Sequence, residues 1–141
     1  MIARVGWQLA ELLTRAEHEV SQRLAAALDA EGLTLNQWRV LSHLADGAGH
    51  TMSDIADHAM LPPATLTRVI DRLVEVNLIY RRGDIGDRRR VLVYLSTRGR
   101  NLHRTLASTL EREEEALTAA LGDQEKELLA ELLERLTARG R

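Results

Sequence analysis

The chain has 141 residues, 45% of them hydrophobic, and a formal net charge of −2 at pH 7; these values indicate one globular domain and exclude a disordered chain. Cysteine is absent, which excludes disulfides, cysteine-based zinc sites and thiol redox switches. No stretch reaches the roughly 18 apolar residues of a membrane span, and the first residues lack the apolar segment of a signal peptide, so we expect a soluble cytoplasmic protein.

The first half of the chain predicts a series of helices. Residues 3–30 carry apolar side chains three and four positions apart, which is the spacing of a long amphipathic helix. Thr34 is expected to cap a second helix, with Gln37 as its partner in a capping box. A short third helix follows over residues 53–60.

The Pro62-Pro63 pair separates the third helix from a fourth, because the residue before a proline avoids the helical region whereas a first helical turn accepts proline. The fourth helix, PPATLTRVIDRLVEV, has an apolar face and an opposite face that is small, hydroxylated and basic. Such a face suits a DNA recognition helix, since Thr reaches phosphates or base edges and Arg binds guanine. An ordinary solvated helix face is the alternative. The candidate DNA contacts on this helix are Thr65, Thr67, Arg68 and Arg72.

A hairpin with a basic tip comes next. Asn77 is suited to a left-handed helix end, and residues 78–82 and 90–96 have the composition of two strands around a glycine-rich connection. The segment from residue 81 to residue 104 has a local charge of +6, which indicates a polyanionic partner or merely a solvated basic face.

Three consecutive arginines, Arg88, Arg89 and Arg90, lie at the predicted hairpin tip. Arginine is favoured in narrow minor grooves, and we expect Asp87 to orient the Arg89 guanidinium through a bidentate ion pair. Because successive strand residues alternate between faces, Arg88 should point away from Arg89 and, like Arg90, contact phosphates. The alternative is a charged tip that only protects the strand edge.

Two further helices complete the predicted fold. Ser96 or Thr97 is expected to cap a fifth helix that runs to about residue 120, and Asp123 a sixth. Their leucine stripes, like that of the first helix, exceed what one copy can cover, which predicts a homodimer. The sixth helix lies in a segment, residues 111–134, with a local charge of −7.

The predicted fold class is therefore mostly α with a small sheet (α+β): a winged helix-turn-helix with long N- and C-terminal dimerisation helices. We expect a single domain over residues 1–141. Within it, residues 34–97 form the DNA-binding part, and residues 1–30 and 98–139 form the dimerisation helices.

Residues 53–99 resemble the core of the MarR family of bacterial transcription regulators. TLTRVIDRL is similar to the family's recognition helix, and DRRRVLVYLS to its Asp-x-Arg wing and following strand. The departures are Asn77 where Gly is common, Thr97 where Pro is common, and the opening Pro62-Pro63. The resemblance implies a homodimer formed by the first, fifth and sixth helices that binds pseudo-palindromic operators in double-stranded DNA, usually as a repressor.

The same resemblance implies release from DNA by a small molecule, often a phenolic or aromatic anion. Family pockets lie between the first, second and fifth helices, and an aromatic wall with Arg or His suits an aromatic carboxylate. The tryptophans could instead be packing residues and the histidines structural. The candidate pocket residues are Trp7, His18, Trp38, Arg39, His43 and His103.

No cofactor, metal site or enzymatic activity is predicted. The five histidines show no i,i+4 pair and no HExxH motif, and there is no phosphate loop or nucleophile motif. Three histidines could still converge in space with a carboxylate, so a metal-responsive regulator of the same fold remains an alternative. Another is a protein-docking winged helix without a DNA role, although such a module would not need the arginines of the tip.

Overall fold

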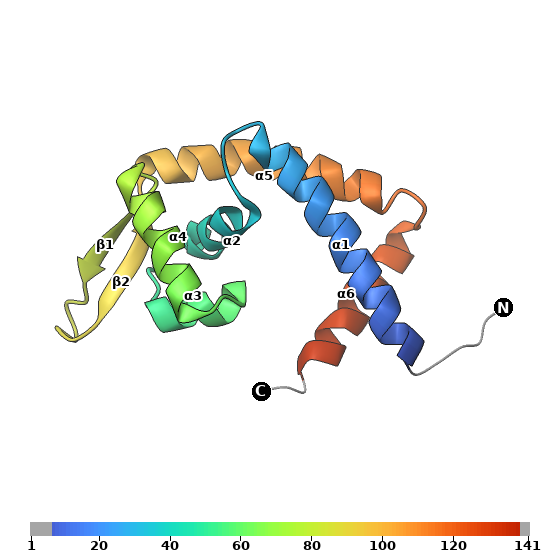
Figure 1. Ribbon diagram of the computed structural model, residues 1–141, viewed down its shortest axis with the longest axis horizontal. Coiled ribbons are helices and arrows are strands. Elements are labelled where there is room, and N and C mark those ends of the chain that lie inside the picture. Colours follow the sequence, from blue (N-terminus) through green and yellow to red (C-terminus); the bar gives the residue numbers. More distant parts are fainter. Residues whose placement is uncertain (1–6, 139–141) are drawn as a thin grey trace.

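The elements follow one another in the order that the sequence predicts (Figure 1). The computed structural model describes residues 7–138, so the expected helix start at residue 3 and the end of the 98–139 range lie outside the described residues. The order is α1 (Trp7–Asp29), α2 (Leu35–His43), a short 3-10 helix η1 (Leu44–Asp46), α3 (Met52–Ala59), α4 (Pro63–Glu75), β1 (Ile79–Gly83), β2 (Val91–Leu95), α5 (Thr97–Leu117) and α6 (Asp123–Ala138).

Local side-chain hydrogen bonds fix the beginnings of the helices. The capping box of α2 is present, since the Gln37 amide donates to Thr34 Oγ1 (3.1 Å) and the Thr34 amide donates to Gln37 Oε1 (2.9 Å). Thr51 caps α3 and Ser96 caps α5. The sixth helix differs slightly from the prediction because Asp123 is its first residue rather than its cap.

Helix ends in the winged helix-turn-helix depend on left-handed residues. Asn77 has φ 63°, as the sequence predicts for a terminator, and lies between α4 and β1. The third helix ends earlier than expected, at Ala59, because Met60 adopts φ 55° and turns the chain before the prolines. Pro63 then occupies the first turn of α4, where its missing N–H costs no hydrogen bond.

The wing is an antiparallel hairpin in which Ile79 pairs with Leu95 and Gly83 with Val91. A third segment joins its edge, because the backbone of His50 exchanges two hydrogen bonds with Val93, of 3.1 and 2.8 Å. The loop between η1 and α3 is thereby tied to the wing.

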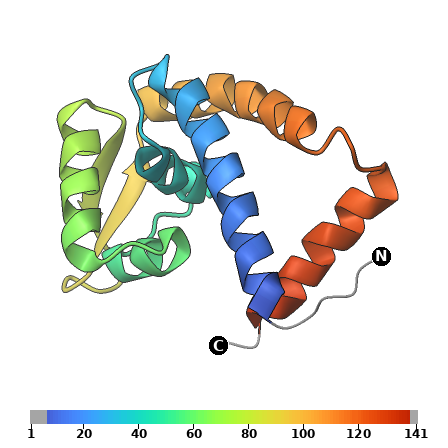
Figure 2. The same cartoon turned by 45° about the vertical axis from the view of Figure 1, so that its right-hand side comes forward.

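The hydrophobic core lies where α2, α3, α4, the wing and the middle of α5 meet. It is aliphatic, as a chain without Phe requires, and α1 contributes Leu28 at its C-terminal end. The remaining length of α1 and all of α6 extend away from this lobe (Figure 2). None of the helices between residues 7 and 138 is long and apolar enough to cross a lipid bilayer.

The base of the wing joins α5 through a close backbone contact. Ser96 Oγ accepts from the Gly99 amide (2.9 Å) and donates to the Asn77 carbonyl (2.7 Å), while the Ser96 amide donates to the Leu78 carbonyl (3.0 Å). Gly99 packs directly on that carbonyl, and a Cβ at this position would lie 2.0 Å from the Leu78 oxygen. Only glycine therefore allows α5 to approach the wing this closely.

We expect Gly99→Ala to lower the free energy of unfolding by about 1–3 kcal/mol, the usual cost of overpacking, because backbone must move to admit the methyl group. Chemical denaturation measures the change. Gly83→Ala is the matched control, since nothing lies within 4 Å of its Cβ position; its effect should stay within about 0.5 kcal/mol. Equal effects of the two substitutions would show that the Gly99 contact is not tight.

Candidate nucleic-acid interface

The outward face of α4 has the composition and exposure that the sequence predicts. Leu66, Ile70 and Leu73 are buried in the core, whereas Thr67, Arg68 and Arg72 are exposed and Thr65 is half-buried. The helix is thus anchored along one side and presents hydroxyl and guanidinium groups on the other. Ala64, at the start of the exposed side, adds little bulk and leaves the first turn accessible.

The polar side chains of α4 differ in whether they have a hydrogen-bond or ion-pair partner within the protein. Thr67 Oγ1 donates to the Pro63 carbonyl within the helix (3.0 Å), and Arg72 forms an ion pair with Glu75 (3.4 Å). Among the described residues, Arg68 has neither a hydrogen bond nor an ion pair through its side chain. Its guanidinium is therefore available to an external acceptor.

An ion pair that the sequence analysis did not anticipate connects α4 to the wing. The Arg81 guanidinium on β1 binds the Asp71 carboxylate on the outward side of α4. Both side chains are largely exposed, so the pair contributes little to global stability. The pair nevertheless links the side of α4 to the first strand of the wing, which lies beside it (Figure 1). The sequence could not have revealed this ion pair, because two opposite charges ten residues apart form no periodic pattern.

The wing tip, residues 84–90, is a pair of tight turns rather than an extension of the strands. Asp84 Oδ1 accepts from the Gly86 amide (2.9 Å), and Asp87 Oδ1 accepts from the Arg89 amide (3.0 Å). Arg90 lies 3.8 Å from the Asp84 carboxylate. Both aspartates therefore shape the backbone of the tip, as Asp commonly does in turns.

Two expectations about the wing tip are wrong in detail. Asp87 binds the backbone amide of Arg89, and within the described chain no ion pair joins it to the Arg89 guanidinium. The alternation of Arg88 and Arg89 between strand faces also fails, because β2 begins only at Val91. The side chain of Asp87 is short and its nearest donor is the turn amide, so turn formation takes precedence over the ion pair. Arg88 and Arg89 are exposed.

The five candidate effector residues whose side chains the structure describes do not form one pocket. Trp38 and His103 stack with ring centroids 4.7 Å apart and planes 9° apart. Arg39 lines a hollow of about 250 Å³ with Trp38, whereas His103 lines a separate hollow of about 420 Å³ along α5. Burial lowers the pKa of His103 below its ordinary value.

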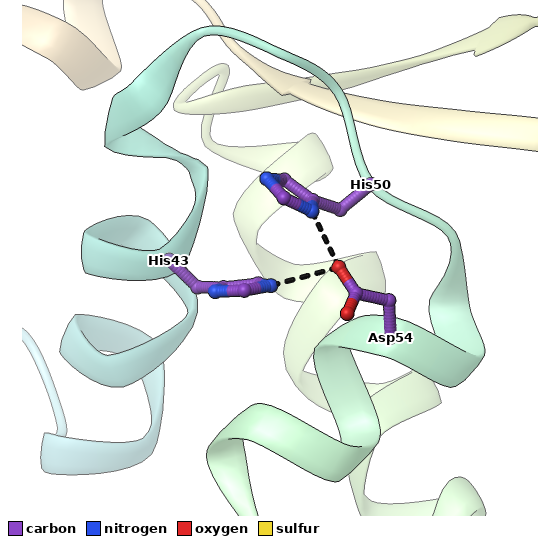
Figure 3. Close-up of side chains that lie close together, drawn as sticks. All are labelled: His43, His50 and Asp54. Carbon is purple, nitrogen blue, oxygen red and sulfur yellow. Dashed lines mark hydrogen bonds and ion pairs between the residues drawn. The ribbon is translucent and has the colours of Figure 1, made fainter.

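Two further candidates, His18 and His43, line neither of these hollows. His18 is exposed on α1, and the side chain of Trp7 lies outside the described residues. His43, at the end of α2, belongs to a cluster with His50 and Asp54 (Figure 3). A search for pairs of histidines in the sequence misses this cluster, because a carboxylate four residues after His50 joins the two rings.

Carboxylates surround His50 on two sides. Partial burial would lower the pKa of His50, but its hydrogen bonds to Asp46 and Asp54 outweigh this effect and raise the pKa above the ordinary value. The hydrogen bonds from His43 and then His50 lower the pKa of Asp54. The amide of Ala48 chiefly lowers the pKa of Asp46.

Comparison with known proteins agrees with this geometry. A sequence model of the MarR family matches residues 31–90. The HTH-type transcriptional regulator FarR of Neisseria gonorrhoeae is 27% identical over 124 residues, which cover 88% of this chain and 85% of FarR. The crystal structure of a mutant Escherichia coli MarR complexed with operator DNA superposes with a TM-score of 0.83 at 25% identity, covering 93% of this chain and 94% of MarR.

A second solved structure is BpsR of Bordetella bronchiseptica, whose DNA binding is regulated by 6-hydroxynicotinic acid. It superposes with a TM-score of 0.82 at 28% identity over 92% of this chain and 98% of BpsR. A recognition helix beside an arginine-tipped hairpin defines a winged helix-turn-helix DNA-binding protein. The chain belongs to the MarR family, and it is a transcriptional regulator.

The Asx turn at the wing tip generates a prediction opposite to simple electrostatics. We expect Asp87→Ala to weaken binding to operator DNA about fivefold, the equivalent of one hydrogen bond of about 1 kcal/mol, although it removes a negative charge. Asp87→Asn is the matched control, because it keeps the oxygen that accepts from the Arg89 amide and should bind at least as tightly as the wild type. Fluorescence anisotropy measures both. Tighter binding by Asp87→Ala with an intact fold would contradict the role of the turn.

Proposed function

We propose that the protein is a homodimeric repressor that binds pseudo-palindromic operators in double-stranded DNA and is released by a small aromatic or anionic effector. The main observation in its support is that α4, with its exposed Thr/Arg face, and the wing, with its arginine tip, belong to one lobe (Figure 1). Relatives support it: MarR was crystallised with operator DNA, and 6-hydroxynicotinic acid regulates the DNA binding of BpsR. Such a regulator acts in the cytoplasm, where the bacterial chromosome lies.

In this proposal α4 enters the major groove and reads the sequence. Arg68, with no partner among the described side chains, supplies a guanidinium for the O6 and N7 atoms of guanine. Thr65 and Thr67 lie at the start of the same helix and suit phosphates or base edges, while Arg72 lies farther along and suits a phosphate. The buried side of α4 holds this face in a fixed orientation.

The wing serves the neighbouring minor groove and the backbone. The exposed Arg88 and Arg89 extend from a tip whose turns are fixed by Asp84 and Asp87. A guanidinium inserts favourably into a narrow minor groove, where the negative potential is strongest. In this proposal Arg89 enters the minor groove and Arg88 contacts a phosphate. Arg90, close to the Asp84 carboxylate, is placed for a phosphate at the edge of the groove.

Dimerisation is assigned to residues 1–30 and 98–139, and DNA binding to residues 34–97, within a single domain. α6 has no buried residue, and a leucine stripe on it is exposed by 38–51%, which is unfavourable for a single copy in water. A second copy covers such a surface through the self-complementary contact of a two-fold dimer. The stripe consists of Leu128, Leu129, Leu132, Leu133 and Leu136.

Of the two hollows described above, the one along α5 is the better candidate for the effector-binding site. It is lined by His103 together with Arg100 and Arg104, so positive charge lies beside the Trp38–His103 stack. This combination suits a flat anion, because a guanidinium binds a carboxylate while the stacked rings offer an aromatic contact nearby. A ligand there would contact the helix that leads from the wing to the dimer region. The protein would act through binding alone and not through catalysis.

Selection of bound duplexes from random DNA tests the function. We expect a palindromic consensus whose half-sites lie about 34–36 Å apart, one helical turn. On the selected site, affinity should fall with salt at a log–log slope of about −0.9 per phosphate contacted. A salt-independent affinity, or a monomer that enriches no sequence, would contradict the proposal and favour a protein-docking winged helix.

Two arginines should differ in what they contribute. Arg68→Ala is expected to relax base preference at one position of each half-site and cost about 1–3 kcal/mol on the best site, because it contacts a base. Arg88→Ala should weaken binding to all duplexes similarly and reduce the salt slope, because it contacts phosphate. Binding to a panel of operator variants distinguishes them. A changed ranking of sites with Arg88→Ala would overturn the assignment.

A further inference from the structure

His43, His50 and Asp54 bring three metal-ligating side chains together inside the DNA-binding lobe (Figure 3). One ligand atom from each lies within 4.8 Å of the other two. His43 Nε2 and His50 Nδ1 both approach the same atom, Asp54 Oδ2, the former at 2.9 Å. We call these three residues the histidine cluster. No function described above uses it.

The three residues come from separate segments whose positions are fixed by other contacts. His43 is the last residue of α2, and its ring stacks on that of His58 with centroids 4.0 Å apart. His50 is held by its paired backbone hydrogen bonds to Val93. Asp54 lies in the first turn of α3, whose cap Thr51 accepts from the Asp54 amide. The ligand atoms are therefore brought together by the fold and not by a flexible loop.

A second carboxylate, that of Asp46, holds the His50 ring through its other nitrogen. Asp46 Oδ1 and Oδ2 lie 3.0 and 2.8 Å from His50 Nε2, the ring nitrogen that faces away from Asp54. A carboxylate behind a ligating histidine recurs in metal sites, where the outer carboxylate fixes the ring and increases its basicity. The geometry at His50 is thus an independent feature that points to a cation.

We propose that the histidine cluster is a binding site for a divalent transition-metal ion such as Zn²⁺ or Co²⁺. Imidazole nitrogens with one carboxylate suit these ions, whereas Mg²⁺ and Ca²⁺ prefer oxygen ligands alone. Ligands about 2.0–2.2 Å from a tetrahedral ion lie roughly 3.3–3.6 Å apart. The 2.9 Å contact between His43 and Asp54 would therefore widen slightly on binding, and the shorter contact between His50 and Asp54 would widen more.

Binding would exchange hydrogen bonds for coordination. Each ligating ring nitrogen must offer its lone pair to the ion, so a proton carried by that nitrogen leaves for solvent or moves to the other nitrogen of the same ring. Three protein ligands leave a further position for water. The ion would join α2, α3 and the segment paired with the wing. It would therefore stabilise the winged part by a free energy that rises with the logarithm of the free ion concentration.

The direct test uses the untagged full-length chain, stripped of metal and without DNA, so that its result is independent of the proposed DNA binding. Titration with Co²⁺ should produce a visible ligand-field absorption that saturates at one Co²⁺ per chain. Addition of Zn²⁺ should abolish this absorption by displacing the Co²⁺. Zn²⁺ should also raise the melting temperature. Absence of both the absorption and the thermal shift would overturn the proposal.

Variants locate the ion. Asp54→Asn and His50→Gln should lose the Co²⁺ absorption, and Asp46→Asn should weaken Zn²⁺ binding about 10–100-fold, as loss of an outer carboxylate does. Asp57→Asn is the matched control, since it removes the same charge from the exposed side of α3 and should bind like the wild type. Equal affinities of Asp54→Asn and Asp57→Asn would refute the site.

A measurement on the wild-type protein makes the test independent of how the variants fold. In NMR spectra, stoichiometric Zn²⁺ should shift the ring signals of His43 and His50 and leave those of His18, exposed on α1, unchanged. Similar shifts of all five histidines would show non-specific surface binding and overturn the assignment.

Discussion

The close contact between the base of the wing and α5 is the constraint on which the rest of the structure depends. Gly99 packs on the Leu78 carbonyl. The Ser96 hydroxyl forms hydrogen bonds with backbone groups on both sides of that contact, the Asn77 carbonyl and the Gly99 amide. Because Val93 and Leu95 of β2 are buried in the same core as Leu66 and Ile70 of α4, the wing and the recognition helix share one rigid support. Because α5 begins directly at this support, a movement of α5 would reach both α4 and the wing.

The charged side chains of the DNA-binding lobe divide into two groups. Arg81 and Arg90 are close to Asp71 and Asp84, and these contacts position the wing against α4 and order its tip. Arg68, Arg88 and Arg89 are exposed and have no side-chain partner among the described residues. Acidic side chains therefore shape the wing and its contact with α4 without neutralising the three guanidinium groups that we propose contact DNA. A slightly acidic chain can thus still present a basic surface.

The histidine cluster and the hollow along α5 are separate features of the DNA-binding lobe, with no residue in common. His50 is tied through Val93 to the buried strand of the wing, and His103 stacks on Trp38 of α2. Each feature contacts an element that positions α4 or the wing. Ligands at these places would act on the same small core, because α2 contributes both His43 and Trp38.

The sequence by itself determined the order of elements, the caps at Thr34 and Ser96, the left-handed Asn77 and the exposed face of α4. These depend on periodicity and on contacts between residues close in the chain. Only the tertiary structure decided that Asp87 binds a turn amide, that Asp71 meets Arg81, and that His43, His50 and Asp54 converge. Such contacts depend on how separate segments pack and on which donor lies nearest, and neither leaves a periodic pattern in the sequence.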